Sequence, residues 1–89
     1  MRSRYIQNKK IIHSKVGEEF VMMDIDSGFY FGLNSVGSVI WNHLEQARTL
    51  NDLVIQLITE YNVDKQVCER ETKGFLNQLL EKNLIKVVE

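Results

Sequence analysis

The sequence predicts an α+β fold of the winged helix-turn-helix type, in which a three-stranded antiparallel sheet is followed by three helices. Two observations carry this prediction. The hydrophobic spacing is strand-like over residues 10–33 and helical over residues 34–83, and the two periods separate strands from amphipathic helices. In addition, the helical stretches are joined by short connections, as in helix-turn-helix arrangements.

The sheet is predicted to be a meander of three consecutive strands. The first strand is a short run that contains Ile11 and Ile12, and the second is the apolar run over residues 20–25. Residues 26–28 form a tight hairpin turn whose glycine is free to take a positive φ. The third strand covers residues 29–33, which are rich in aromatic side chains, as strands tend to be.

Each predicted helix has a capping signal at its start. Asn34 or Ser35 caps the first helix, Thr49 and Asp52 resemble a capping box for the second, and Asp64 caps the third. Behind these caps, apolar side chains recur on one helical face. The three apolar stripes consist of Val36, Val39, Ile40 and Leu44; of Leu50, Leu53, Val54, Leu57, Ile58 and Tyr61; and of Cys68, Thr72, Phe75, Leu76, Leu79 and Leu80.

Length and composition indicate one small domain over residues 1–89, with residues 1–9 expected to be flexible. The 11 basic and 12 acidic side chains nearly balance, which argues against a nucleic-acid partner. A single cysteine excludes an internal disulfide and fits a reducing compartment, so a cytoplasmic location is expected. No apolar run is long enough for a membrane span, and no secretory signal is recognisable.

The residues that enzymes commonly use are present but are not arranged for catalysis. Cys68 lies on an apolar helical stripe, which favours a buried structural role over a reactive thiol. His13 and His43 are not paired with it at metal-ligand spacing, and Asp24 and Asp26 flank a turn. We therefore predict a non-enzymatic protein with no catalytic residues, no metal and no cofactor.

Two surfaces are candidates for binding. The third helix, which is expected to end near Asn83, carries a second row of side chains beside its buried face. A mid-helix glycine in this row is unfavourable and tends to stay where a neighbouring backbone comes close, although packing of the helix on its own sheet would explain it equally well. The row consists of Val67, Glu71, Gly74 and Gln78, with Phe75 shared between the two faces.

The second surface is the edge of the third strand. Residues 29–33 contain neither charge nor proline, the usual means of protecting a strand edge. Such an edge is either covered by the chain itself or free for a partner, and the expected closing strand or wing at residues 84–88 is the candidate cover. If the edge is free, a peptide can add as a further strand between it and the third helix.

Motifs along the chain occur in an order and spacing that resemble the PqqD-like family. They are an apolar strand with a Ser-Gly turn, an aromatic pair and Leu-Asn within residues 21–34, then Val36-Gly37, Ile40-Trp41, the segments 49–53 and 61–64, Phe75-Leu76 and Leu84-Ile85. The resemblance covers nearly the whole chain beyond residue 15. It implies a stand-alone recognition element for the precursors of ribosomally synthesised, post-translationally modified peptides.

Members of that family bind the leader segment of a precursor peptide by pairing it with the third strand, against the third helix. Carried over to this sequence, the resemblance and the helical geometry give the following candidate peptide-binding residues: Phe29, Tyr30, Phe31, Gly32, Leu33, Val67, Glu71, Gly74, Phe75 and Gln78. We favour the lasso-peptide subtype, whose partners are a leader peptidase and a cyclase. The alternative within the family is the pyrroloquinoline-quinone type, which passes its precursor to a radical-SAM enzyme.

Two further interpretations remain open at this stage. A DNA-binding winged-helix regulator would need a basic recognition helix, whereas the third helix mixes Glu69 and Glu71 with Lys65, Arg70 and Lys73. Homodimerisation through the open strand edge is the other alternative, and it is compatible with peptide binding.

Overall fold

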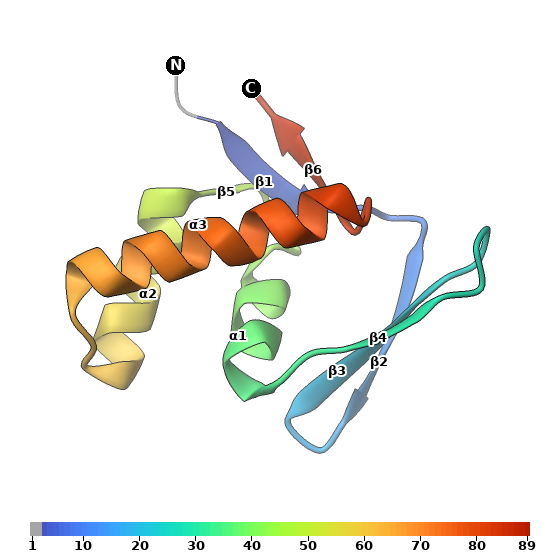
Figure 1. The fold of residues 1–89 in the computed structure, drawn as a ribbon, viewed down its shortest axis with the longest axis horizontal. Coiled ribbons are helices and arrows are strands. Elements are labelled where there is room, and N and C mark those ends of the chain that lie inside the picture. Colours follow the sequence, from blue (N-terminus) through green and yellow to red (C-terminus); the bar gives the residue numbers. More distant parts are fainter. Residues whose placement is uncertain (1–2) are drawn as a thin grey trace.

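The computed structural model describes residues 3–89 and has the predicted α+β architecture, with winged-helix-like helices and small antiparallel sheets. Figure 1 shows the arrangement of its elements. In chain order they are β1 (Arg4–Gln7), β2 (Ile11–Val16), β3 (Glu19–Asp24), β4 (Tyr30–Gly32), α1 (Ser35–His43), β5 (Arg48–Thr49), α2 (Leu50–Tyr61), α3 (Lys65–Glu81) and β6 (Ile85–Val88).

The predicted meander is confirmed as the sheet β2-β3-β4. Its strands are antiparallel, and the register pairs Met22 of β3 with Phe31 of β4. Gly17 and Gly28 have φ values of 64° and 75°, a region that side chains disfavour and glycine tolerates. The Gly28 amide donates to the carbonyl of Asp24 over 2.7 Å, so the hairpin closes at the predicted turn.

A second sheet, β5-β1-β6, was not foreseen as such. The segment 84–88 supplies its strand β6, which pairs with β1 in a register that places Gln7 opposite Ile85. Residues 4–7 of the N-terminal segment that was expected to be flexible form the paired strand β1, and Met1 and Arg2 lie outside the described residues. Figure 1 shows β1 and β6 side by side.

The helix caps are the predicted ones. The Asn34 side chain accepts the Gly37 amide over 2.8 Å, which decides the alternative between Asn34 and Ser35. Thr49 and Asp52 form a reciprocal capping box with both distances at 3.0 Å, and Asp64 caps α3. These contacts satisfy amides at helix starts that have no partner within the helix.

At their C-terminal ends, α2 and α3 are each followed by an asparagine in the left-handed region. Asn62 has φ 51° and Asn83 has φ 59°, and asparagine tolerates this conformation better than most residues. The position of Asn83 was predicted, whereas the same role of Asn62 was not.

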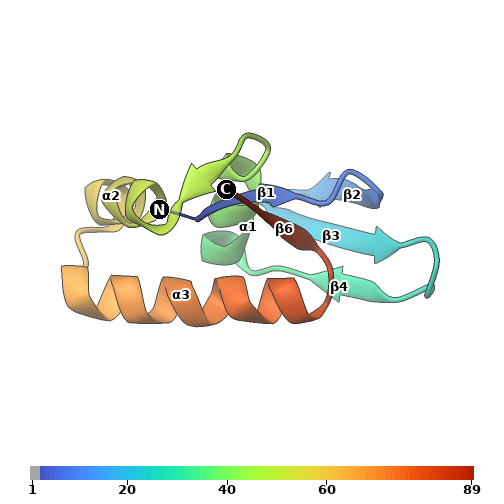
Figure 2. The ribbon, with the colours of Figure 1, turned by 90° about the horizontal axis from the view of Figure 1, so that it is seen from above.

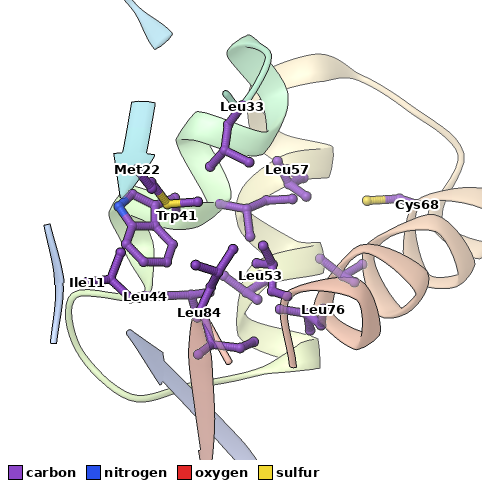
Figure 3. Close-up of a cluster of buried hydrophobic side chains, with 14 residues drawn as sticks. Ile11, Met22, Leu33, Trp41, Leu44, Leu53, Leu57, Cys68, Leu76 and Leu84 are labelled. Atoms are coloured by element: carbon purple, nitrogen blue, oxygen red, sulfur yellow. The ribbon is translucent and has the colours of Figure 1, made fainter. Parts of the chain in front are cut away.

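The hydrophobic core joins the sheets to the helices through Trp41 of α1. Figure 3 shows Met22 and Ile11 from the meander close to the Trp41 ring, with Leu53 and Leu76 from the longer helices on the other side. The indole N–H of Trp41 donates to Nδ1 of His13 over 2.6 Å. The core consists of Ile11, Met22, Leu33, Ile40, Trp41, Leu44, Leu53, Val54, Leu57, Cys68, Leu76, Leu79, Leu84 and Ile85.

The two elements expected to bind a ligand are placed on one side of the molecule. Figure 2 shows α3 and β4 along the same side, with β3 and then β2 successively farther from that side. Within residues 3–89, no helix is long and apolar enough to cross a membrane.

Candidate functional site

The outer edge of β4 is left unpaired by the other strands in the part of the chain that the structure describes. β4 is the terminal strand of its sheet, and within residues 3–89 no strand pairs with its outer side. The closing strand β6 pairs with β1 instead. Phe29 and Tyr30 are 64% and 71% exposed. The edge is therefore open to pairing with another strand.

The hydrogen-bond pattern identifies which backbone groups face this opening. The amide of Leu33 donates to the carbonyl of Phe20 on β3 over 2.9 Å, and the carbonyl of Phe29 accepts a β3 amide over 3.0 Å. Because the direction of backbone groups alternates along an antiparallel strand, Tyr30 and Gly32 direct their N–H and C=O groups away from β3. These two residues thus present the hydrogen-bonding groups of the open edge.

A groove runs beside the edge, between β4 and the three helices. It has a volume of about 630 Å³. Its lining, which defines the groove here, consists of Gly32, Leu33, Asn34, Val36, Gly37, Ile40, Leu57, Tyr61, Val63, Val67, Cys68, Glu71, Thr72, Phe75 and Gln78. Most of these side chains are apolar, so the groove suits apolar side chains of an extended ligand.

The floor of the groove depends on a close approach between α1 and α3 at Gly37. A Cβ atom at this position would lie 3.2 Å from Cζ of Phe75 and 3.3 Å from Oδ1 of Asn34. A Cβ at Gly74, by contrast, would meet nothing within 4 Å. Packing of α3 on its own sheet, one of the two explanations considered for Gly74, is therefore wrong, and the tight glycine contact is at Gly37.

A buried hydroxyl fixes the sheet relative to α1. The Phe20 amide donates to Oγ of Ser38 over 2.9 Å, and the same Oγ donates to the carbonyl of Leu33 over 3.3 Å. This hydroxyl thus bridges the two strands where a direct ladder bond would otherwise form. It sets the end of β4 against the start of α1, which is where the groove begins.

The candidate peptide-binding residues fall into two groups. One group lines the groove: Gly32, Leu33, Val67, Glu71, Phe75 and Gln78. The others lie outside the lining. Phe29, Tyr30 and Phe31 belong to the strand and the loop before it, and Gly74 is exposed on α3. Their roles as binding residues stay predictions.

The Phe31 side chain of β4 lies close to Phe29 and to Lys82 at the C-terminal end of α3. Its ring is 6.2 Å from that of Phe29, and the Lys82 ammonium lies 5.2 Å from the Phe31 ring centroid. A cation at this distance is attracted to the ring face. This contact connects the strand to the C-terminal end of α3.

The sequence interpretation missed the groove residues that come from the three helices and the segments that connect them. Most of them had been assigned to the core because they belong to the apolar stripes of the helices. Their spacing does not distinguish them from the other members of those stripes. They are Asn34, Val36, Gly37, Ile40, Leu57, Tyr61, Val63, Cys68 and Thr72.

The residues considered for chemistry are placed apart. Cys68 is buried, with its Sγ 3.8 Å from Oγ1 of Thr72, and His13 serves as acceptor for Trp41. Asp24 accepts the Asp26 amide within the hairpin turn. Residues 3–89 contain no cluster of His, Cys, Asp or Glu side chains that could hold a metal ion.

Comparison with known proteins points to one family. A family model described as Coenzyme PQQ synthesis protein D (PqqD) matches residues 19–85, which is more than half of the chain. No curated protein matches the chain.

Two solved structures are similar over most of their length. One is TbiB1 in complex with the TbiA(beta) leader peptide, with 32% sequence identity and a TM-score of 0.85, covering 91% of this chain and 94% of that chain. The other is lasso peptide synthetase B1 complexed with the leader peptide, with 23% identity and a TM-score of 0.82, covering 92% of this chain and 96% of that chain.

Proposed function

The chain belongs to the PqqD family, and from this premise we propose that it is a non-catalytic recognition element for the leader segment of a ribosomally synthesised precursor peptide. The leader adds as a further strand to the outer edge of β4 and rests against α3. The open β4 edge beside an apolar groove carries the proposal. The match to TbiB1, which was solved with a leader peptide, supports it.

The edge and the groove make complementary contributions to binding. The outward N–H and C=O groups of Tyr30 and Gly32 are oriented for ladder bonds to an added strand, which contribute about 0.5–1.5 kcal/mol each. Alternate side chains of that strand point towards α3, where Val67 and Phe75 line the groove. Backbone pairing thus holds any extended segment, and the groove selects among side chains.

Within the family, lasso-peptide maturation is the pathway we propose. The chain is 32% identical to TbiB1 over 91% of its length, and the second similar structure is a lasso peptide synthetase B1. In this pathway the bound leader is delivered to a separate leader peptidase, and a cyclase acts on the core peptide. Delivery to a radical-SAM enzyme is the alternative suggested by the PqqD description.

A titration of fluorescently labelled leader peptides tests the proposal. The probes are the TbiA(beta) leader and the leader of any short precursor encoded beside this protein's gene, with a scrambled peptide as control. We expect a dissociation constant on the order of 1 µM or tighter for at least one leader. No binding above the scrambled peptide for any probe would contradict the proposal.

A matched pair of variants locates the site. Gly74 lies outside the lining but in the α3 row that also holds Val67, Glu71 and Gln78 of the groove. Gly74→Glu adds a charge in that row, where a side chain meets nothing in the free protein, and we expect about 10-fold weaker leader binding. Asn77→Glu makes the same charge change on an exposed position outside the groove lining and should leave affinity unchanged. Equal affinities for the two variants would place the leader elsewhere.

Delivery is tested separately by mixing this chain, the neighbouring leader peptidase and its precursor. We expect leader cleavage to be faster in the presence of this chain and to return to the basal rate with Gly74→Glu.

A gel shift with duplex DNA at low salt should show no complex, since a shift would favour the DNA-binding alternative.

A further inference from the structure

Gly32 occupies a position where the fold itself does not require glycine. It is the last residue of strand β4, where it still pairs with Val21, and its φ is not in the positive range that favours glycine. A Cβ there would meet nothing within 4 Å. Glycine weakens a strand because it has more conformational freedom and no side chain to pack, and it often marks the close approach of a ligand.

A second depression begins at this glycine. It lies at the end of the meander away from the 26–28 turn and has a volume of about 410 Å³. It shares Gly32, Leu33 and Asn34 with the groove. We call this depression the Gly32 hollow. It is lined by Val16, Glu19, Phe20, Val21, Gly32, Leu33 and Asn34.

Strand addition to β4 would place ligand side chains on both faces of the sheet. Successive side chains of a strand point to opposite faces, and residues directly opposite each other on paired strands share a face. Val21 is the partner of Gly32 on β3. The ligand residue opposite Gly32 therefore directs its side chain to the face of Val21, and its neighbours point to the opposite face, where the groove lies.

The absence of a side chain at Gly32 leaves room for this ligand residue to reach across β4. Val21 and Val16 provide apolar surface in the hollow and are both exposed, Val16 at 66%. Glu19 is the only acidic residue among those that line the hollow. Lys15 pairs with Phe20, which also lines the hollow, and its ammonium lies 5.9 Å from the centroid of that ring. Strand alternation directs the Lys15 side chain to the face opposite Val21 and Glu19.

We infer that the bound peptide is recognised on both faces of β4, and that the Gly32 hollow receives a lysine or arginine side chain. Its aliphatic stem lies over Gly32 and against Val21, and its charged head reaches Glu19. This inference rests on the proposed binding of an extended peptide to β4. It adds a second determinant of leader specificity, on the face of the sheet turned away from α3.

Selection from a randomised peptide display library tests the inference without a known ligand. Against the wild-type chain, we expect enriched peptides with apolar residues on either side of one position that prefers lysine or arginine. Glu19→Lys should remove or reverse the preference at that position and leave the apolar preferences intact. Glu18→Lys, a matched change at a residue outside the hollow, should keep the basic preference.

A second variant tests the role of the glycine. Gly32→Val keeps the outward N–H and C=O groups and suits a strand, but its side chain fills the entrance of the hollow. We expect about 10-fold weaker binding of a peptide selected by the wild type, and restored binding when glycine or alanine replaces the basic residue of that peptide.

The outcomes separate this inference from the proposed function. A basic preference that persists in Glu19→Lys, or undiminished binding by Gly32→Val, would overturn the second determinant while strand addition stands. If the wild type enriches no peptide, or if Gly74→Glu binds the selected peptides as tightly as the wild type, the proposed function itself fails and the inference fails with it.

Discussion

The two sheets of this molecule differ in how their edges are used. The sheet β5-β1-β6 collects strands from both ends and the middle of the chain, with β1 paired on both sides. The sheet β2-β3-β4 consists of consecutive strands, and among residues 3–89 no strand pairs with the outer side of β4. The first sheet joins distant segments and stabilises the fold. The second sheet has an edge strand, β4, whose outer side is paired by no strand within residues 3–89.

Substitutions in the two sheets should therefore affect different properties, and the largest effect is expected in β6. Ile85 is 3% exposed and belongs to the core. Ile85→Asp would bury a carboxylate without a partner and lower the free energy of unfolding by on the order of 3 kcal/mol or more. Urea denaturation measures this, and Ile85→Val, expected to cost about 0.5–1.5 kcal/mol, gives a folded variant for comparison.

The matched change in the open sheet is Tyr30→Asp. Because Tyr30 is 71% exposed, we expect the free energy of unfolding to change by no more than about 0.5 kcal/mol, with leader binding weakened. A comparable loss of stability for Tyr30→Asp and Ile85→Asp would contradict the assignment of stability to one sheet and of binding to the other.

The same contrast between filled and open surroundings separates two glycines. At Gly37 a side chain would press on Phe75, so Gly37→Val should lower the free energy of unfolding by about 1–3 kcal/mol. At Gly74 there is open space, so Gly74→Ala should raise it by about 0.5–1 kcal/mol, through the better helix propensity of alanine. Thermal unfolding checks both, and a destabilised Gly74→Ala would show that glycine is needed there by the free protein.

Local chemistry explains why much of the fold could be predicted from the sequence. The caps at Asn34, Thr49 and Asp64 depend on side chains that accept from amides three residues away, and the hairpin turn depends on Gly28. Such contacts leave a signature in a few neighbouring residues. The strand edge was equally readable, since its lack of charge and proline is a local property.

Non-local packing explains what was missed. Strand β5 has two residues, and β1 is stabilised by pairing with a segment some eighty residues away, so neither has a clear pattern of its own. In the site, the close approach of Phe75 to Gly37 depends on how α1 and α3 cross. No spacing rule distinguishes that glycine from Gly74, which looked the more important one in the sequence.

Amide hydrogen exchange, followed residue by residue with and without a bound leader peptide, is the most direct test of strand addition to β4. In the free protein we expect the amides of Tyr30 and Gly32 to exchange quickly and that of Phe31, which faces β3, to exchange slowly. Leader binding should protect Tyr30 and Gly32 strongly and leave β1 and β6 unchanged. Saturating leader with no added protection at Tyr30 and Gly32 would contradict strand addition to this edge.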